Sequence, residues 1–125
     1  MTDALSGRRV LIVEDESLVA MLLEAVLGDL GCTVIGPESN IDDGLRVVTG
    51  EAQLDAALLD VNVAGQEVFP VAEALKARGI PFVFSTGYGE SGLPNEWRGN
   101  PTVQKPFTDA AIRDALMAAL NIATV

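Results

Sequence analysis

The stretch Val10-Leu11-Ile12-Val13-Glu14-Asp15 shows the pattern from which the fold of this chain can be argued. Four consecutive apolar residues, three of them β-branched, are typical of a strand buried on both faces. The strand ends on acids, and a helical pattern then runs from Ser17 to Leu30, where Gly31 ends it. Residues recurring at the spacing of one helix face are Leu18, Met21, Leu22, Ala25 and Val26. The stretch therefore predicts one strand–helix unit.

Similar units follow along the chain. Short apolar runs predict strands at 33–35, broken by Gly36-Pro37, and at 56–59, 82–84 and 102–104. Helical patterns occupy 41–49 behind a capping Asn40, 68–78, and the segment after a capping Thr108. Strands alternating with helices predict a parallel sheet covered on both faces, with right-handed crossovers. We expect one α/β domain over residues 1–125, with a shortened or irregular fourth helix between 86 and 101.

Composition excludes several classes of protein. The 125 residues hold 8 basic and 18 acidic side chains, a net charge of −10, which argues against nucleic-acid and anionic-membrane binding. There is no histidine and a single cysteine, so His-dependent nucleophilic catalysis, intrachain disulfides and multi-cysteine zinc sites are excluded. No apolar run approaches a membrane span, and the first residues do not resemble a secretory signal. We expect a cytoplasmic protein.

Polar residues gather where the predicted strands end, at the sheet edge where open parallel sheets bind ligands. Successive strands deliver Glu14 and Asp15, then Asp60, then Ser85 and Thr86, and last Lys105. Clustered carboxylates raise one another's pKa unless a cation relieves them, and Mg²⁺ prefers carboxylate and phosphate oxygens. Acids at strand ends are also common as solvated loop residues, but three on one edge opposite a lysine favour a metal and phosphate site. A nucleotide cradle would need glycines after the first strand, where this chain has acids.

Taken in order, these residues resemble the receiver domain of two-component response regulators over essentially the whole chain. Glu14-Asp15 matches the family's metal-binding pair and Asp60 its phosphoacceptor. Thr86 matches the conserved hydroxyl, and Lys105-Pro106-Phe107 matches the lysine-proline-aromatic motif. The resemblance implies the flavodoxin-like (βα)5 fold, a doubly wound sheet of five parallel strands.

The segment Pro81-Phe82-Val83-Phe84-Ser85-Thr86-Gly87-Tyr88 is similar to the hallmark of a single-domain subgroup with a Phe-Ala-Thr-Gly-Tyr-like motif, with Ser85 in place of Ala. Asp60-Val61-Asn62-Val63-Ala64-Gly65 is similar to the same subgroup. Such proteins are typical of alphaproteobacteria and usually lack an output domain, which the end of the chain at Val125 fits. The family's usual proline after the phosphoacceptor is replaced by Ala64, and its aromatic switch residue by Thr102.

The resemblance implies roles for these residues. Asp60 accepts a phosphoryl group from a phosphohistidine of a sensor histidine kinase or histidine phosphotransfer protein, as carboxylate nucleophiles do. Mg²⁺ is held directly by Asp15 and Asp60, through water by Glu14, and by the backbone carbonyl of Asn62. Lys105 pairs with Asp60 and then with a phosphoryl oxygen, while Thr86 donates to another. Tyr88 is the candidate switch residue, and the 86–100 loop is expected to shift on phosphorylation.

We therefore predict a stand-alone receiver that signals through protein–protein contacts. It is not an enzyme beyond self-catalysed phosphotransfer and dephosphorylation, and it is a monomer or weak dimer. Two alternatives stay open. One is a pseudo-receiver, a scaffold of the same fold without phosphorylation. The other is a small Mg²⁺-dependent aspartyl phosphatase or phosphotransferase, which normally needs a cap domain for which 125 residues leave no room.

Overall fold

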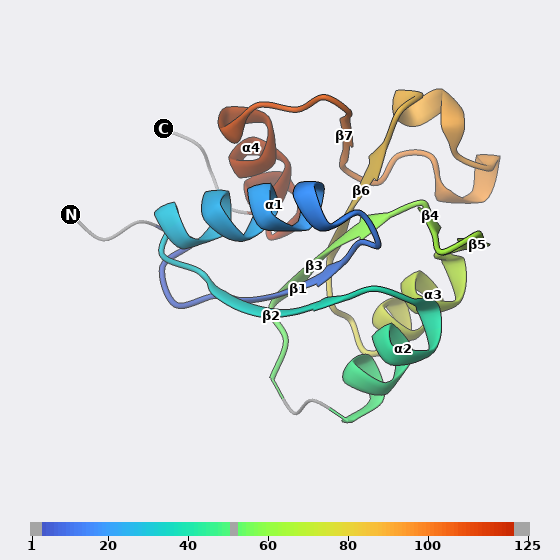
Figure 1. The fold of residues 1–125 in the computed structure, drawn as a ribbon, viewed down its shortest axis with the longest axis horizontal. Coiled ribbons are helices and arrows are strands. Elements are labelled where there is room, and N and C mark those ends of the chain that lie inside the picture. The colour runs from blue at the N-terminus through green and yellow to red at the C-terminus, as the bar shows by residue number, and fades with distance from the viewer. Residues whose placement is uncertain (1–3, 51–52, 122–125) are drawn as a thin grey trace.

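The computed structural model describes residues 4–50 and 53–121, and they form a three-layer α/β fold (Figure 1). Five parallel strands make the central sheet in the order β2-β1-β3-β6-β7. These strands are β1 (Arg9–Val13), β2 (Thr33–Glu38), β3 (Ala56–Asp60), β6 (Phe82–Thr86) and β7 (Thr102–Gln104). A separate hairpin, β4 (Asn62–Val63) and β5 (Gln66–Glu67), follows β3. The predicted parallel sheet is confirmed.

Helices cover both faces of the sheet. One face carries α1 (Ser17–Asp29) and α4 (Asp109–Ala119), and the other carries α2 (Ile41–Gly50) and α3 (Phe69–Ala77) (Figure 1). The predicted caps are present, because Asn40 Oδ1 accepts from the Asp43 N–H and Thr108 Oγ1 from the Ala111 N–H. None of the described helices is long and apolar enough to cross a membrane.

Each strand contributes side chains to the core on both faces of the sheet, because successive side chains alternate between the two faces. Leu11 and Leu59 join the core cluster under α2 and α3, whereas Ile12 and Leu58 join the cluster under α1 and α4. The strand order reverses between β1 and β3, since the chain leaves β1 for β2 on one side and returns to β3 on the other. In open α/β sheets, ligands bind at such a reversal, which here lies at the carboxyl ends of β1 and β3.

The predicted irregular fourth helix is confirmed. The segment after β6 holds only two short 3₁₀ turns, η1 (Gly89–Gly92) and η2 (Asn95–Trp97). Trp97 is buried and its ring stacks on Phe69 at a centroid distance of 5.6 Å, with Phe82 and Phe84 edge-on to it. One large aromatic side chain therefore covers sheet surface that a regular helix would otherwise cover.

Two sequence-based predictions about α1 and β2 are wrong. The strand expected to break at Gly36-Pro37 continues to Glu38, because the pairing with β1 shifts register there and resumes at Val13. In α1, Leu18, Met21 and Leu22 are exposed, whereas the helix is buried through Ala20, Leu23, Val26 and Leu27. Apolar residues surround most of this helix, so the periodicity did not single out the face that packs.

Candidate functional site

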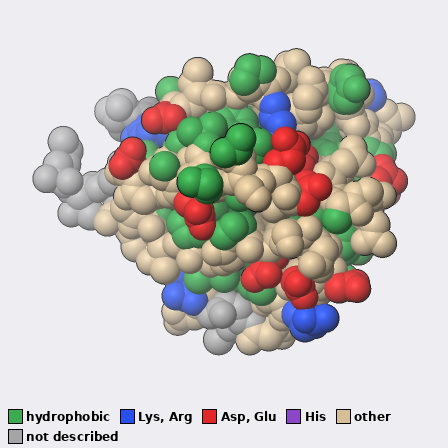
Figure 2. All heavy atoms as spheres, in the orientation of Figure 1, with side chains coloured by type: hydrophobic (Ala, Val, Ile, Leu, Met, Phe, Trp, Pro, Cys, Tyr) green, Lys and Arg blue, Asp and Glu red, His purple; other side chains and the backbone are tan. Residues whose placement is uncertain are grey.

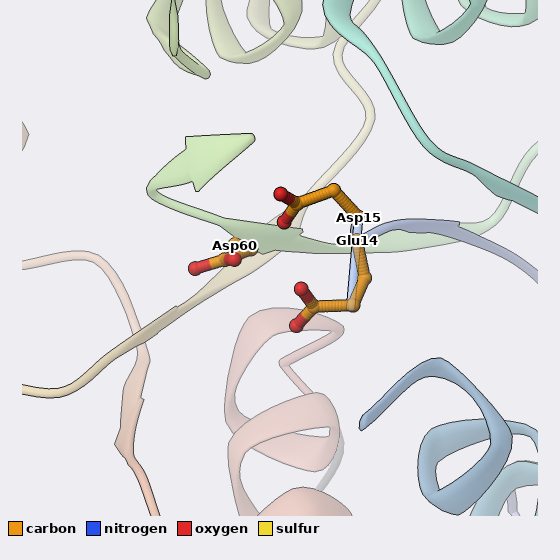
Figure 3. A group of neighbouring side chains, drawn as sticks. All are labelled: Glu14, Asp15 and Asp60. Atoms are coloured by element: carbon orange, nitrogen blue, oxygen red, sulfur yellow. The ribbon is translucent and has the colours of Figure 1, made fainter. Parts of the chain in front are cut away.

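Three carboxylates meet at the carboxyl ends of β1 and β3. Glu14 and Asp15 follow β1 directly, and Asp60 is the last residue of β3. Each offers a carboxylate oxygen, and these oxygens lie within 4.8 Å of one another. Figure 3 shows all three side chains turned into the same space. Glu14 and Asp60 are buried and Asp15 is exposed, so the cluster opens to solvent on the Asp15 side.

Lys105 reaches into this cluster from the end of β7. Its Nζ lies 3.2 Å from Glu14 Oε1 and 3.4 Å from Asp60 Oδ2. Its backbone N–H donates to the Thr86 carbonyl at 2.9 Å, which extends the β6–β7 pairing by one residue. The side chain is therefore directed by the sheet itself toward Asp60, as the sequence analysis expected for a lysine at this strand end.

Burial changes the pKa of two of these groups. Burial, together with the neighbouring Asp60, raises the pKa of Glu14 to about 7, although the Glu16 N–H and the Lys105 charge act to lower it. Burial lowers the pKa of Lys105, but the charges and hydrogen bonds of Asp60 and Glu14 outweigh that effect and raise its pKa overall. The lysine is therefore a firmly held cation, and Glu14 carries a proton part of the time near neutral pH.

The β4–β5 hairpin holds Asp15 in position. The Ala64 N–H donates to Asp15 Oδ2 at 3.1 Å, and Ala64 and Gly65 form a two-residue turn with φ of 51° and 80°. Positive φ at both turn residues is the type I′ geometry of tight hairpins. A proline at position 64 could neither donate nor adopt this φ. Sequence reasoning noted the missing proline but did not predict the hairpin, because Ala-Gly is a weak turn signal. Asn62 begins this hairpin and is exposed.

Thr86 is the last residue of β6, the strand that pairs with β3, and Tyr88 follows two residues later. Thr86 is buried, and its Oγ1 accepts a hydrogen bond from the Tyr88 N–H at 3.1 Å. The hydrogen of the threonine hydroxyl is not used in that bond. The Tyr88 side chain is 78% exposed. A Cβ placed on Gly92 would lie 2.9 Å from Tyr88 Cβ and 3.0 Å from Thr86 Oγ1, so the η1 turn is packed closely against both residues.

The structure thus brings together Glu14, Asp15, Asp60 and Lys105, and the Tyr88 side chain is exposed to solvent. The donor set suits Mg²⁺, which takes carboxylate oxygens and keeps several waters. Asp15 and Asp60 offer an exposed and a buried carboxylate from two different strands, and Glu14 lies within reach of both. The arrangement can hold a hard cation and an anion beside a nucleophilic carboxylate.

Comparisons with known proteins decide the family. SdrG from Sphingomonas melonis is 44% identical, with a TM-score of 0.82 over 93% of this chain and 98% of SdrG. The REC domain of the Erythrobacter litoralis response regulator PhyR is 29% identical, with a TM-score of 0.82 over 98% of both chains. This chain is a response regulator receiver domain. Among curated proteins, the phyllosphere-induced regulator PhyR of Methylorubrum extorquens is 32% identical over 115 residues, 89% of this chain and 43% of PhyR.

This receiver domain spans less than half the length of the curated relatives it matches. No family model matches it, so the assignment rests on individual relatives and on the fold. The family is that of two-component signalling, as the sequence analysis predicted. SdrG is similar over its whole length, whereas PhyR is similar over part of its length.

Proposed function

We propose that this receiver accepts a phosphoryl group on Asp60 from a phosphohistidine of a sensor kinase or histidine phosphotransfer protein, in a Mg²⁺-dependent reaction. The observation that carries the proposal is the position of Lys105 Nζ, 3.4 Å from Asp60 Oδ2 and 3.2 Å from Glu14 Oε1. A cation held by two buried acids neutralises charge next to the nucleophile and remains available to a phosphoryl oxygen.

The transfer needs little from the chain beyond positioning. A carboxylate oxygen of Asp60 attacks phosphorus, the bond between phosphorus and the donor nitrogen breaks, and an acyl phosphate forms. Phosphoryl transfer passes through a loose transition state in which placement and charge neutralisation dominate. Lys105 binds one phosphoryl oxygen and the Thr86 hydroxyl donates to another. The chain's lack of histidine is compatible with this chemistry, because the acceptor carboxylate has no proton to lose.

The groups proposed to hold Mg²⁺ are the side chains of Asp15, Asp60 and Glu14 and the backbone carbonyl of Asn62. When bound, the cation would offset the negative charge that the carboxylates and the phosphoryl group bring together. One similar protein supports the Mg²⁺ site, and a second supports the proposed phosphorylation. The receiver domain of PA1611 from Pseudomonas aeruginosa, 22% identical with a TM-score of 0.75, has a magnesium ion in its active site cleft. SdrG has also been solved in a BeF₃-activated conformation.

An apolar surface on α1 is proposed as the place where the phosphoryl donor docks. Leu18, Met21 and Leu22 are 81%, 62% and 46% exposed. Beside them lies a groove of about 290 Å³ lined by Val19, Leu22, Lys105, Pro106 and Phe107. Figure 2 shows hydrophobic side chains gathered over α1, next to acidic ones. Because Lys105 borders both the groove and the acidic cluster, a protein seated on this surface stands at the entrance to Asp60.

Output is proposed to run through the segment after β6. Phosphorylation draws the Thr86 hydroxyl toward the new anion, which releases the Tyr88 N–H and shifts the 86–100 segment that a partner protein reads. The PhyR of Bartonella quintana, 25% identical, is an anti-anti-sigma factor, so a partner from such a pathway is one form this output can take. Signalling of this kind implies a cytoplasmic protein.

The test is incubation with acetyl phosphate and Mg²⁺ followed by intact-mass measurement. A single phosphoryl adduct is expected, and Asp60→Asn should abolish it. Asp42→Asn, on exposed α2 surface, is the matched control and should be labelled like the wild type. Absence of an adduct with any donor would make the chain a scaffold, and repeated turnover of small phosphate esters would make it a phosphatase.

A further inference from the structure

Ser85 carries a buried hydroxyl that the proposed function does not use. The residue is 3% exposed, and its Oγ has no hydrogen-bond partner among the described residues. A buried hydroxyl without a partner is costly, and native proteins rarely retain one unless it has a role. The Phe-Ala-Thr-Gly-Tyr-like motif has alanine at this position, so the hydroxyl is not needed to build the strand.

The sheet register places Ser85 directly beside Asp60. The two residues are Cα partners in the β3–β6 ladder, and the Val61 N–H donates to the Ser85 carbonyl at 3.2 Å. Leu58 and Val83, two residues earlier on each strand, are also partners, and both lie in the core cluster under α1 and α4. Alternation along the strands therefore puts the Ser85 and Asp60 side chains on the same face of the sheet.

Other site groups lie along the same row. Val13 pairs with Leu59 across β1 and β3, so Glu14 flanks Asp60 on the side opposite Ser85. Glu14 is linked to Lys105, and Lys105 to Asp60, whereas Ser85 is linked to neither acid. The β6 side of Asp60 thus has an unused donor, and the β1 side has an acid that repels anions.

We propose that the Ser85 hydroxyl donates a hydrogen bond to an oxygen of the acyl phosphate formed on Asp60, in addition to the contact from Lys105. An acyl phosphate brings several strong acceptor oxygens to a site where the resting carboxylate leaves the hydroxyl without a partner. No bond is made or broken by Ser85. The hydroxyl lowers the stability of the resting protein and raises that of the phosphorylated one, so it biases the receiver toward a long-lived phosphorylated state.

This inference rests on phosphorylation of Asp60, and the test separates the two. Titrate the wild type, Ser85→Ala and Ser85→Cys with BeF₃⁻ in saturating Mg²⁺, and follow the decay of the acetyl-phosphate adduct by intact mass. Hydrogen bonds to charged groups are strong enough that both variants should bind BeF₃⁻ about 10- to 100-fold more weakly. Their adducts should also decay faster. Cysteine is close to serine in size but a weak donor, so it separates the hydrogen bond from the volume.

Stability should change in the opposite direction. Without Mg²⁺ or BeF₃⁻, Ser85→Ala should melt about 2 to 8 °C above the wild type, because the unpartnered hydroxyl is gone. Ser6→Ala, an exposed serine next to Gly7 at the other end of the sheet, is the matched control and should change neither quantity. Equal BeF₃⁻ affinity and adduct lifetime in wild type and Ser85→Ala would overturn the role of Ser85 alone. A wild type that takes up neither probe would overturn the proposed function.

Discussion

Replacing Glu14 by glutamine should remove most of the pH dependence of stability that the site creates. Glu14 is 2% exposed, and burial beside Asp60 raises its pKa from 4.5 to about 7. The folded protein therefore binds this proton more tightly than the unfolded chain does. Its contribution to stability is fully present below about pH 4.5 and is lost as the pH rises through about 7. Glutamine keeps the size and hydrogen bonding of the protonated acid but does not titrate.

The size of the effect follows from the pKa. At about 1.4 kcal/mol per pKa unit, the rise to about 7 corresponds to about 3 kcal/mol in all. Most of this, about 2 to 3 kcal/mol, falls between pH 5 and pH 8. The difference in unfolding free energy between Glu14→Gln and the wild type should therefore grow by about 2 to 3 kcal/mol, in favour of the variant, from pH 5 to pH 8. Titrating groups that do not contact Glu14 cancel in this difference.

The assay is urea denaturation in EDTA at pH 5, 6, 7 and 8, which keeps divalent cations out of the site. Glu73→Gln, on the exposed surface of α3, is the matched control and should follow the wild type at every pH. A difference between Glu14→Gln and the wild type that stays constant across this range would refute the reasoning. A wild type whose unfolding free energy increases relative to that of Glu14→Gln as the pH rises would also refute it.

Three further outcomes are expected. Mg²⁺ should bind about tenfold more weakly at pH 6 than at pH 8, because Glu14 must lose its proton to interact favourably with the cation. Calorimetry measures this, and a Mg²⁺ affinity that does not change between pH 6 and pH 8 would contradict it. Gly92→Ala should lower the unfolding free energy by about 1 to 3 kcal/mol in urea denaturation, since its Cβ would lie 3.0 Å from Thr86 and 2.9 Å from Tyr88. Gly87→Ala, which has open space around its Cβ, should lower it less. Met21→Lys should slow phosphoryl transfer from a phosphorylated kinase about tenfold and leave labelling by acetyl phosphate unchanged. Gly28→Lys on the same helix is the control, and equal slowing by both substitutions would contradict docking on this surface of α1.

Much of the fold could be predicted because its signals are local. Apolar β-branched runs, helix caps at Asn40 and Thr108, and the glycines after 86 each act within a few residues of themselves. The meeting of Glu14, Asp60 and Lys105 could also be predicted. Parallel strands end at one edge, so residues that follow different strands become neighbours without any knowledge of packing.

Other features depend on which surfaces come together. The buried face of α1 is set by the fit of Leu23 and Leu27 against the sheet, and apolar residues on its other side gave a competing periodicity. The β4–β5 hairpin donates the Ala64 N–H to the Asp15 carboxylate, a contact between residues 49 positions apart that no local pattern predicts.

The amino-acid sequence by itself determined the layered α/β architecture and the set of groups at its reactive edge, because both follow from short-range patterns and from where each strand stops. Only the tertiary structure decided how those groups behave. The burial of Glu14 that raises its pKa, and the isolation of the Ser85 hydroxyl beside Asp60, arise from side chains distant in sequence that exclude water around them.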